Sequence, residues 1–485
     1  MSVLALDAGT TGVTALAVEP DGTVSSRGYA EFPQHFPEPG WVEHDPEEIW
    51  QALLSAAAAC VEQAGTPPVA VGITDQRETA VLWRRADLSA PRRAIVWQDR
   101  RTAQMCDDLR QAGHEALVTS VTGLRLDPYF TGTKLAWLAE NDRAWQGVQS
   151  GETVCGTVDS YVVARLTGGA QHVTDASNAS RTLLYDIRTG LWSQRLADLF
   201  GVPLSALPAV VDSSGVCGTT DPSAFLGLEL PIGGIAGDQQ AALFGQACFD
   251  VGQSKCTYGT GSFLLVNTGT IPETSGRGLL TTVAWRIDGV TTYALEGSIF
   301  VTGAAVQWLR DGLHLIPTSP DVEELAASVP DSGGVVFVPA LTGLGAPDWD
   351  PTARGAILGL TRGTTSAHLA RATLEAIAFE VRDVADVLPL PITDLTVDGG
   401  AAANDLLCSL QAGQLGVPVR RPQILETTGL GAAFLAGLAV GVWPDLDALR
   451  QTWRLDREFA PDPAARDDGG HVRWRDAVKR AQHWA

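Results

Sequence analysis

Two short segments rich in glycine and threonine have the residue types that bind phosphate. They are Asp7-Ala8-Gly9-Thr10-Thr11 and, in the second half of the chain, Tyr258-Gly259-Thr260-Gly261-Ser262. Glycine lets the backbone approach a phosphate, hydroxyls and main-chain N–H groups donate to its oxygens, and a nearby carboxylate can hold Mg²⁺ through water. Each segment alone is also typical of an ordinary hairpin turn. Together with Asp398-Gly399-Gly400 before an expected helix, they predict two phosphate-binding turns and a glycine-rich seat for an adenine nucleoside.

Asp238 is the first candidate for a catalytic base. It follows the apolar segment 231–236 and lies between Gly237 and Gln239. Its carboxylate is therefore expected at the carboxyl end of a strand, where α/β sheets bind ligands. A carboxylate there can accept the proton of an attacking hydroxyl during phosphoryl transfer. Because the residues from Gln239 onward are typical of a helix, helix capping is the alternative role for Asp238.

A β-hairpin is expected around each glycine-rich segment. Residues 3–8 and 13–18 flank the first segment, and residues 255–258 and 263–267 flank the second. Each hairpin opens one half of the chain, which is the pattern of a duplicated α/β fold with a cleft between its halves. We place the division near residue 250, giving domains of residues 1–250 and 251–485.

Helices and further strands complete the expected elements. Asp45 is expected to cap a helix that runs to Ala64, because Pro46 suits its first turn and Glu48 completes a capping pattern. The remaining elements are helices at 301–313, 366–386, 403–415 and 428–441, and strands at 69–73, 94–97 and 394–398.

Composition and charge exclude several classes of protein. The chain of 485 residues has 56 acidic and 34 basic side chains and a net charge of −22, so nucleic acid and anionic membrane surfaces are not expected partners. Its seven cysteines are scattered without a Cys-x-x-Cys pair, which fits a cytoplasmic protein rather than a disulfide framework. The first residues lack the basic segment of a signal peptide. The apolar segment 430–443 is too short to span a bilayer and predicts a buried helix.

Ten sequence blocks carry a resemblance to a known family. They are residues 39–46, 72–79, 94–102, 127–134, 234–246, 258–263, 294–297, 303–311, 359–364 and 398–404. With these blocks the chain resembles the FGGY carbohydrate kinases of the actin/hexokinase/Hsp70 superfamily and, within that family, the members that phosphorylate glycerol. The resemblance implies two duplicated ribonuclease-H-like domains with a central cleft. It also implies the cofactors ATP and Mg²⁺, the products ADP and sn-glycerol 3-phosphate, and a homodimer or homotetramer.

The resemblance also assigns roles to individual residues. A polyol site is implied at Arg77, Glu78, Trp97, Tyr129, Asp238, Gln239 and Phe263. A nucleotide site is implied at Thr10, Thr11, Gly12, Thr260, Gly303, Gln307, Gly400 and Asn404, with Asp7 beside Mg²⁺. These types suit their tasks, since carboxylates, an amide and a guanidinium pair the hydroxyls of a triol while aromatic rings cover its C–H face.

Some positions depart from the pattern, and two rival functions stay open. Glycerol-specific members follow the first glycine-threonine turn with an arginine that reaches the nucleotide phosphates, whereas this chain has Thr14. No basic residue lies between Gly218 and Pro231, and no histidine lies between His172 and His314, so control by a sugar bisphosphate or by histidine phosphorylation is not expected. The rivals are a kinase for another polyol or sugar, such as erythritol or xylulose, and a non-catalytic actin-like regulatory protein.

Overall fold

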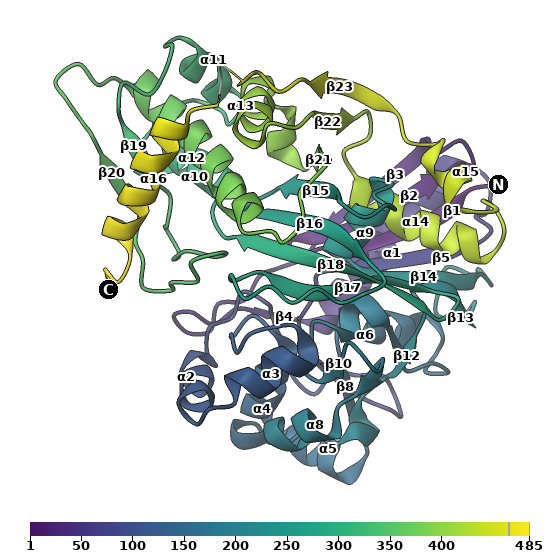
Figure 1. Cartoon of the computed structure of the whole chain (residues 1–485). Coiled ribbons are helices and arrows are strands. Elements are labelled where there is room, and N and C mark those ends of the chain that lie inside the picture. Colours follow the sequence, from purple (N-terminus) through teal and green to yellow (C-terminus); the bar gives the residue numbers. More distant parts are fainter. Residues whose placement is uncertain (464–465, 485) are drawn as a thin grey trace.

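A single 13-stranded sheet runs through the molecule, with helices on both of its faces (Figure 1). The computed structural model describes residues 1–463 and 466–484. The strand order is β23-β22-β21-β15-β16-β18-β17-β13-β14-β5-β1-β2-β3. Both glycine-rich turns lie on this sheet, so one scaffold positions both candidate phosphate sites.

The first half of the chain forms one end of the sheet. Strands β1 (Val3–Ala8) and β2 (Gly12–Val18) form the predicted antiparallel hairpin, and β3 (Val24–Glu31) pairs with β2. On the other side of β1, strand β5 (Val71–Asp75) runs parallel to it, and β14 (Pro231–Gly237) runs parallel to β5. The carboxyl ends of β1, β5 and β14 therefore meet at one edge.

The second half repeats this arrangement. Strands β15 (Gln253–Tyr258) and β16 (Ser262–Gly269) form the second hairpin, and β18 (Val290–Ile299) pairs with β16. Strands β21 (Asp394–Asp398) and β22 (Val419–Pro422) follow in parallel on the other side of β15. The order and directions match those of the first half, so the predicted duplicated α/β fold is confirmed. Strands β17 (Leu280–Ile287) and β13 (Ser214–Thr219) join the two groups.

The helices pack against the sheet or form lobes beside it. The helices are α1 (Pro46–Ala64), α2 (Ala103–Gln111), α3 (Glu115–Thr122), α4 (Thr131–Asn141), α5 (Trp145–Ser150), α6 (Val158–Leu166), α7 (Ala176–Ala179), α8 (Gln194–Phe200), α9 (Asp238–Gly245), α10 (Gly303–Gln307), α11 (Asp321–Ala327), α12 (Ser366–Asp386), α13 (Asp405–Leu415), α14 (Thr427–Ala439), α15 (Leu446–Arg450) and α16 (Asp468–Ala481). The remaining strand of the 13-stranded sheet is β23 (Leu455–Phe459) at its edge. The strands outside this sheet are short: β4 (Glu43–His44), β6 (Val81–Arg84), β7 (Ala94–Ile95), β8 (Thr153–Gly156), β9 (Val173–Asp175), β10 (Tyr185–Asp186), β11 (Leu191–Trp192), β12 (Ala209–Val211), β19 (Val336–Val338) and β20 (Ala356–Leu358).

Helix α14 covers the sheet of the opposite half. Although it belongs to the second half of the sequence, it packs against β1, β5, β14 and α9. The approach depends on glycine, because a Cβ at Gly431 would lie 1.8 Å from the backbone oxygen of Ala241. The predicted apolar helix is thus buried, although it ends at Ala439. No helix in the described part of the chain is long and apolar enough to cross a membrane.

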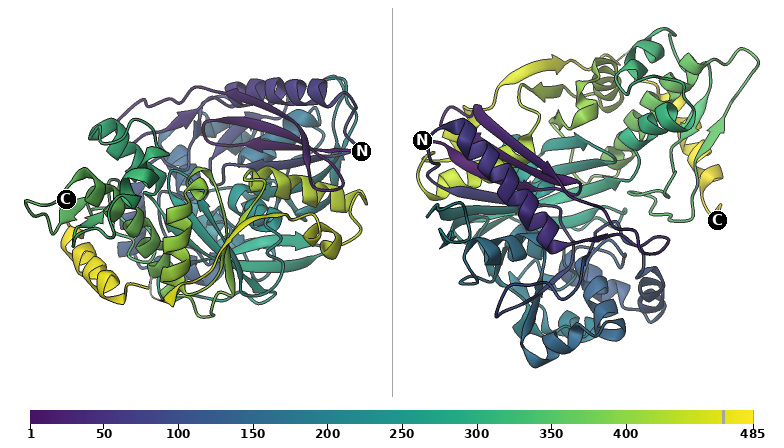
Figure 2. Two further views of the ribbon diagram at one scale, coloured as in Figure 1. Left: turned by 90° about the horizontal axis from the view of Figure 1, so that it is seen from above. Right: turned by 180° about the vertical axis from the view of Figure 1, so that it is seen from behind.

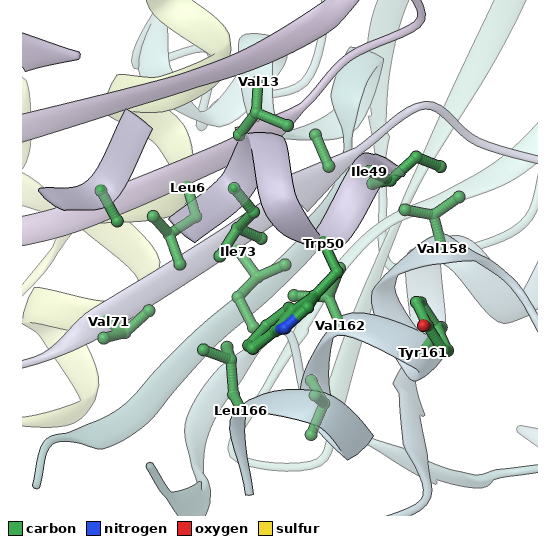
Figure 3. Close-up of a cluster of buried hydrophobic side chains, with 14 of the residues drawn as sticks. Leu6, Val13, Ile49, Trp50, Val71, Ile73, Val158, Tyr161, Val162 and Leu166 are labelled. Carbon is green, nitrogen blue, oxygen red and sulfur yellow. The ribbon is translucent and has the colours of Figure 1, made fainter. Parts of the chain in front are cut away.

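The first hydrophobic core lies between α1, the sheet and α6. Seen from behind, α1 crosses β2 and β3 (Figure 2), and it packs against both strands. Trp50 of α1 is 4% exposed and lies among Ile73, Val162 and Leu166 in the same core cluster (Figure 3). Burying such side chains stabilises the fold by about 2 kcal/mol each. This core fixes the strands whose ends carry the candidate site.

Two local expectations were wrong, and one expected helix changes its type along its length. The helix expected at 301–313 is the short α10 followed by a π-helical turn at Trp308–Gly312, and the strand expected at 94–97 is the two-residue β7. Asp45 does cap α1, since its side chain accepts from the Glu47 N–H at 2.9 Å. Glu48 does not complete the capping pattern, because its Oε2 contacts His35 Nε2 at 2.9 Å instead.

Candidate active site

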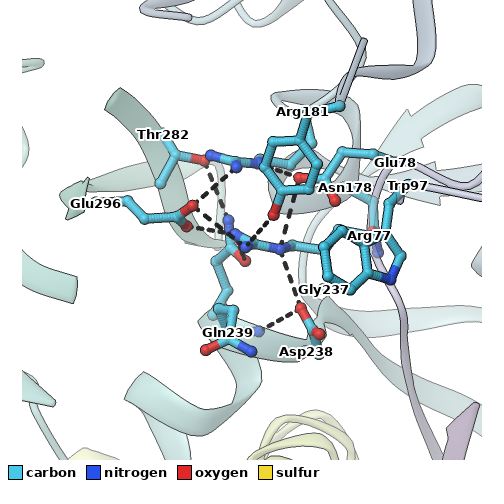
Figure 4. Close-up of polar contacts among 12 residues, drawn as sticks. Arg77, Glu78, Trp97, Asn178, Arg181, Gly237, Asp238, Gln239, Thr282 and Glu296 are labelled. Atoms are coloured by element: carbon cyan, nitrogen blue, oxygen red, sulfur yellow. Dashed lines mark hydrogen bonds and ion pairs between the residues drawn. The ribbon is translucent and has the colours of Figure 1, made fainter. Parts of the chain in front are cut away.

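The seven residues predicted to hold a polyol lie together at one edge of the sheet. Figure 4 labels Arg77, Glu78, Trp97, Asp238 and Gln239 among them. Arg77 and Glu78 follow β5, Asp238 and Gln239 open α9 directly after β14, and Phe263 lies on β16. The two remaining residues are Trp97, two residues after β7, and Tyr129, two residues before α4. The Trp97 and Tyr129 rings contact each other with centroids 5.6 Å apart, and the Arg77 guanidinium lies 5.8 Å from the Phe263 centroid.

Arg77 is at the centre of this cluster, and every one of its N–H groups has a protein partner. Its Nη atoms donate to both carboxylate oxygens of Glu296, to Gln240 Oε1 at 3.2 Å and to the Tyr129 hydroxyl at 3.2 Å. Its Nε pairs with Asp238 Oδ1 at 3.0 Å. The side chain is 2% exposed, so a guanidinium in this position is held rigidly. With all of its N–H groups paired in this way, Arg77 orients the carboxylate of Asp238.

Two charged residues of this cluster were missed by the sequence interpretation. Glu296 on β18 and Arg181 after α7 join Arg77 and Glu78 in a closed set of alternating charges, which we call the charge ring. Arg181 Nε lies 2.7 Å from Glu78 Oε1, and its Nη2 lies 2.9 Å from Glu296 Oε1. All four side chains are at most 2% exposed. A lone carboxylate in the apolar strand around Glu296 was the available signal, because buried charges require partners.

Burial and the two arginines set the ionisation of the ring carboxylates. Burial alone would raise the pKa of Glu296, but Arg181 and Arg77 lower that pKa to about 2. Burial raises the pKa of Glu78, and the same two arginines counteract that rise. Glu78 also has a positive φ of 64°, a backbone conformation that non-glycine residues rarely adopt. Strain of this kind is held by surrounding structure and is concentrated at functional sites.

Asp7 and Asp238 form an acidic pair at the ends of β1 and β14. Burial, together with the charge of Asp238, raises the pKa of Asp7 to about 7. A carboxylate destabilised in this way suits a nearby divalent cation, since hard cations bind oxygen ligands and offset the repulsion. Among the residues that the structure describes, no group of three or more histidine, cysteine or acidic residues could hold a metal by itself. The buried Asp7 carboxyl, with its raised pKa, is the group that would accompany a magnesium ion.

A cavity of about 320 Å³ lies beside the second glycine-rich turn. Five of the predicted nucleotide residues line it: Thr260, Gly303, Gln307, Gly400 and Asn404. Apolar residues, among them Val306, Leu374 and Ile377, form much of the remaining wall. Its size and lining suit a flat heterocycle, because small-molecule sites are apolar with a few placed polar groups. Gly303 approaches the second turn closely, since a Cβ there would lie 2.6 Å from the Gly259 oxygen.

The other three predicted nucleotide residues lie in the first turn and do not line this cavity. Thr10 and Thr11 connect β1 to β2, which begins at Gly12. The Thr10 hydroxyl accepts a hydrogen bond from Trp97 Nε1 at 3.0 Å, so this turn reaches the polyol cluster. Gly12 packs tightly, because a Cβ there would lie 2.7 Å from the Ala30 oxygen. Contact of this turn with a nucleotide phosphate stays a prediction.

Two cation–π contacts join the halves beside the cluster. The Arg100 guanidinium lies 5.5 Å from the Phe300 centroid, and the Arg125 guanidinium lies 5.2 Å from the Trp349 centroid. The two rings are themselves in contact, with centroids 6.0 Å apart. Such contacts contribute about 0.5–1 kcal/mol each at exposed sites. The Arg100–Phe300 contact connects the segment after Trp97 to the segment before Gly303.

Comparison with known proteins covers both halves of the chain. The N-terminal domain model of the FGGY family of carbohydrate kinases matches residues 2–245, and the C-terminal domain model of that family matches residues 254–440. The glycerol kinase of Aromatoleum aromaticum is 56% identical over 491 residues, covering 99% of each chain. The crystal structure of Plasmodium falciparum glycerol kinase with ADP is similar at a TM-score of 0.91 with 33% identity, covering 99% of this chain and 98% of that one. The xylulose kinase of Rhodospirillum rubrum is similar at a TM-score of 0.87 with 25% identity, covering 99% of each chain.

Proposed function

We propose that this chain, which belongs to the FGGY family of carbohydrate kinases, is a glycerol kinase. It transfers the γ-phosphoryl group of ATP to a terminal hydroxyl of glycerol and releases sn-glycerol 3-phosphate and ADP. The observation that carries the proposal is the cluster in which Asp238, held by Arg77, lies among the polyol residues of a chain 56% identical to a named glycerol kinase. The apolar cavity beside the second turn supplies room for the adenosine.

Asp238 is the base in the proposed mechanism. Its Oδ1 accepts from its neighbour Gln239 N at 2.7 Å and pairs with Arg77, while its side chain stays 31% exposed. The attacking hydroxyl gives its proton to this carboxylate as its oxygen forms a bond to the γ-phosphorus. The bond from that phosphorus to the bridging oxygen breaks, and ADP leaves in line. Trp97, Tyr129 and Phe263 cover the C–H face of the polyol and exclude water, which otherwise competes for the phosphoryl group.

The nucleotide is held by hydroxyls and backbone rather than by cations. Thr10, Thr11 and Thr260 are the hydroxyl donors of the two turns, and Asp7 is the carboxylate that would accompany Mg²⁺. The bound magnesium neutralises charge on the phosphate oxygens. Gly400 and Asn404 flank the adenosine, and Gln307 lines the same cavity. The division into domains 1–250 and 251–485, a homodimer or homotetramer, and a cytoplasmic location are parts of the same proposal.

Asp238→Asn tests the proposed base. The amide keeps the size of the side chain but accepts no proton, so kcat should fall by about 10³-fold, as is typical for loss of a general base. Glycerol binding, measured by calorimetry, should change by less than about fivefold. Asp447→Asn, at an aspartate that is 87% exposed, is the matched control and should keep full activity. Turnover within about threefold of the wild type in Asp238→Asn would show that Asp238 is not the base.

The rival functions are separated by substrate competition. Glycerol, erythritol, xylulose and dihydroxyacetone are compared by ADP release at equal concentrations. Glycerol should have the largest kcat/KM, and a larger value for a competitor would move the assignment to another kinase of the family. Absence of ADP release with every substrate would favour the non-catalytic protein.

A further inference from the structure

Lysine is scarce in this chain, and its placement is informative. The sequence has three lysines, Lys134, Lys255 and Lys479, among 34 basic residues. Lys134 and Lys255 are both 0% exposed. Burying an ammonium group is costly unless it is hydrogen-bonded, so each buried lysine requires specific acceptors. Lys134 meets this requirement at the carbonyl of Tyr129, whereas Lys255 contacts a side chain of the proposed polyol site.

Lys255 lies on β15, beneath the start of α9. Its Nζ donates to Gln239 Oε1 and, at 2.8 Å, to the hydroxyl of Thr257. Burial lowers the pKa of Lys255, while the carboxylates of Asp398 and Asp238 act in the opposite direction and favour the ammonium form. The lysine thus fixes the carbonyl end of the Gln239 amide by a hydrogen bond.

This contact fixes which way the Gln239 amide faces. An ammonium group has three donors and no acceptor, so the amide oxygen must be the atom that faces Lys255. The amide nitrogen then faces away from the lysine, and in the described part of the chain Gln239 Nε2 has no protein acceptor. The two N–H groups are left for a ligand. They belong to the residue that directly follows Asp238, whose carboxylate is an acceptor.

We propose that Lys255 is a positioning residue that keeps Gln239 as a hydrogen-bond donor toward the polyol. The inference rests on the proposed function and deepens it. A hydroxyl group both donates and accepts, so a carboxylate beside an amide nitrogen presents the complementary pair. If the amide were turned by 180°, a carbonyl oxygen and a carboxylate would face one hydroxyl, and one of the two acceptors would lose its partner.

A double-mutant cycle between Lys255 and Gln239 tests this role. Lys255→Met keeps the length of the side chain and removes the ammonium, and the amide is then free to turn. kcat/KM for glycerol should fall by about tenfold, with KM for ATP unchanged, since the turned amide leaves a buried acceptor unpaired. In a Gln239→Ala background the same Lys255→Met change should have an effect below about twofold, because the amide that it positions is absent.

The outcomes separate this inference from a general role in stability and from the proposed function. Lys479→Met, at a lysine side chain that is 68% exposed, is the matched control and should leave both KM values unchanged. Losses in the cycle that multiply, or an equal rise in KM for ATP, would overturn the positioning role. A wild-type enzyme that is inactive on glycerol would instead contradict the proposed function, before any variant is compared.

A second variant keeps the test decisive if Lys255→Met does not fold. Gln239→Glu retains an acceptor for Lys255 and an ion pair in the same place, but it has no N–H group to offer. Its kcat/KM for glycerol should fall as far as that of Gln239→Ala, by about tenfold or more. Activity within about twofold of the wild type in Gln239→Glu would show that donation from residue 239 is not used.

Discussion

The polyol cluster and the nucleotide cavity lie on one sheet but are built by opposite means. The cluster is buried and highly charged, and the charge ring of Arg77, Glu78, Arg181 and Glu296 pairs cations with carboxylates within it. The cavity of about 320 Å³ is largely apolar, and Glu323 is the one charged residue among those that line it in the described chain. On the proposed function, the small neutral ligand would be recognised by preset charges, whereas the polyanion would be recognised by shape, hydroxyls and backbone.

The largest expected effect comes from breaking the charge ring. Glu296→Gln leaves Arg77 and Arg181 without their shared carboxylate, and breaking a buried ion pair costs about 3–5 kcal/mol of the free energy of unfolding. We expect kcat/KM for glycerol to fall by about 100-fold through loss of the Arg77 position, consistent with the cost of small misplacements in active sites. KM for ATP should stay within twofold.

A milder change at the same carboxylate serves as the control for this prediction. Ser298→Ala removes one hydrogen bond to Glu296 Oε1, which measures 2.9 Å, and leaves the ring intact. Its loss in stability should be about 1 kcal/mol, as for a single hydrogen bond. Thermal unfolding and steady-state kinetics with each substrate measure both variants. An equal rise in both KM values for Glu296→Gln would show that the two sites are not built independently.

The next expected effect comes from a change in the nucleotide cavity that should leave the polyol cluster unaffected. A Cβ at Gly400 would meet no protein atom within 4 Å, so Gly400→Ala should not change the free energy of unfolding. If the adenosine packs here, the added methyl group occupies part of its space, and KM for ATP should rise by about tenfold, the equivalent of one lost contact. KM for glycerol should not change. Gly399→Ala is the contrast, because Gly399 has φ of +81° and its Cβ would lie 2.6 Å from the Tyr258 oxygen, so it should lower stability. An unchanged KM for ATP in Gly400→Ala would place the nucleotide elsewhere.

The last expected effect is a pH dependence of stability that arises from Asp7. Because the folded protein raises the pKa of Asp7 from 3.8 to about 7, the folded state holds this proton more tightly than the unfolded chain does. Stability from the protonated form is present below pH 4 and is lost as pH rises to about 7. The unfolding temperature of the wild type should therefore decrease as the pH rises from about 4 to about 7, relative to that of Asp7→Asn. MgATP should stabilise the wild type more at pH 8 than at pH 6, and equal stabilisation at both would contradict a cation beside Asp7.

Local patterns predicted the elements that carry the site. The two hairpins, α12 at Ser366–Asp386 and β21 at Asp394–Asp398 lie where periodicity and turn residues placed them. The family resemblance, rather than spacing, brought the seven polyol residues into one set. The structure adds what no local pattern encodes: Arg77 pairs with Glu296 across 219 positions, and Lys255 fixes an amide on another element. The helix expected at 301–313 is present over 303–312, but it changes from α-helix to a π-helical turn after Gln307, which no local pattern indicated.

The scarcity of lysine has a practical consequence for handling the protein. Two of the three lysine amines are buried in the fold, so reagents that attack primary amines reach two groups, Lys479 on α16 and the exposed α-amino group of Met1. Coupling through these two amines would attach the molecule to a dye or a solid support without modifying the two buried lysines. The cleft residues would remain chemically unmodified, and an immobilised enzyme prepared in this way should retain the kinetics of the free one.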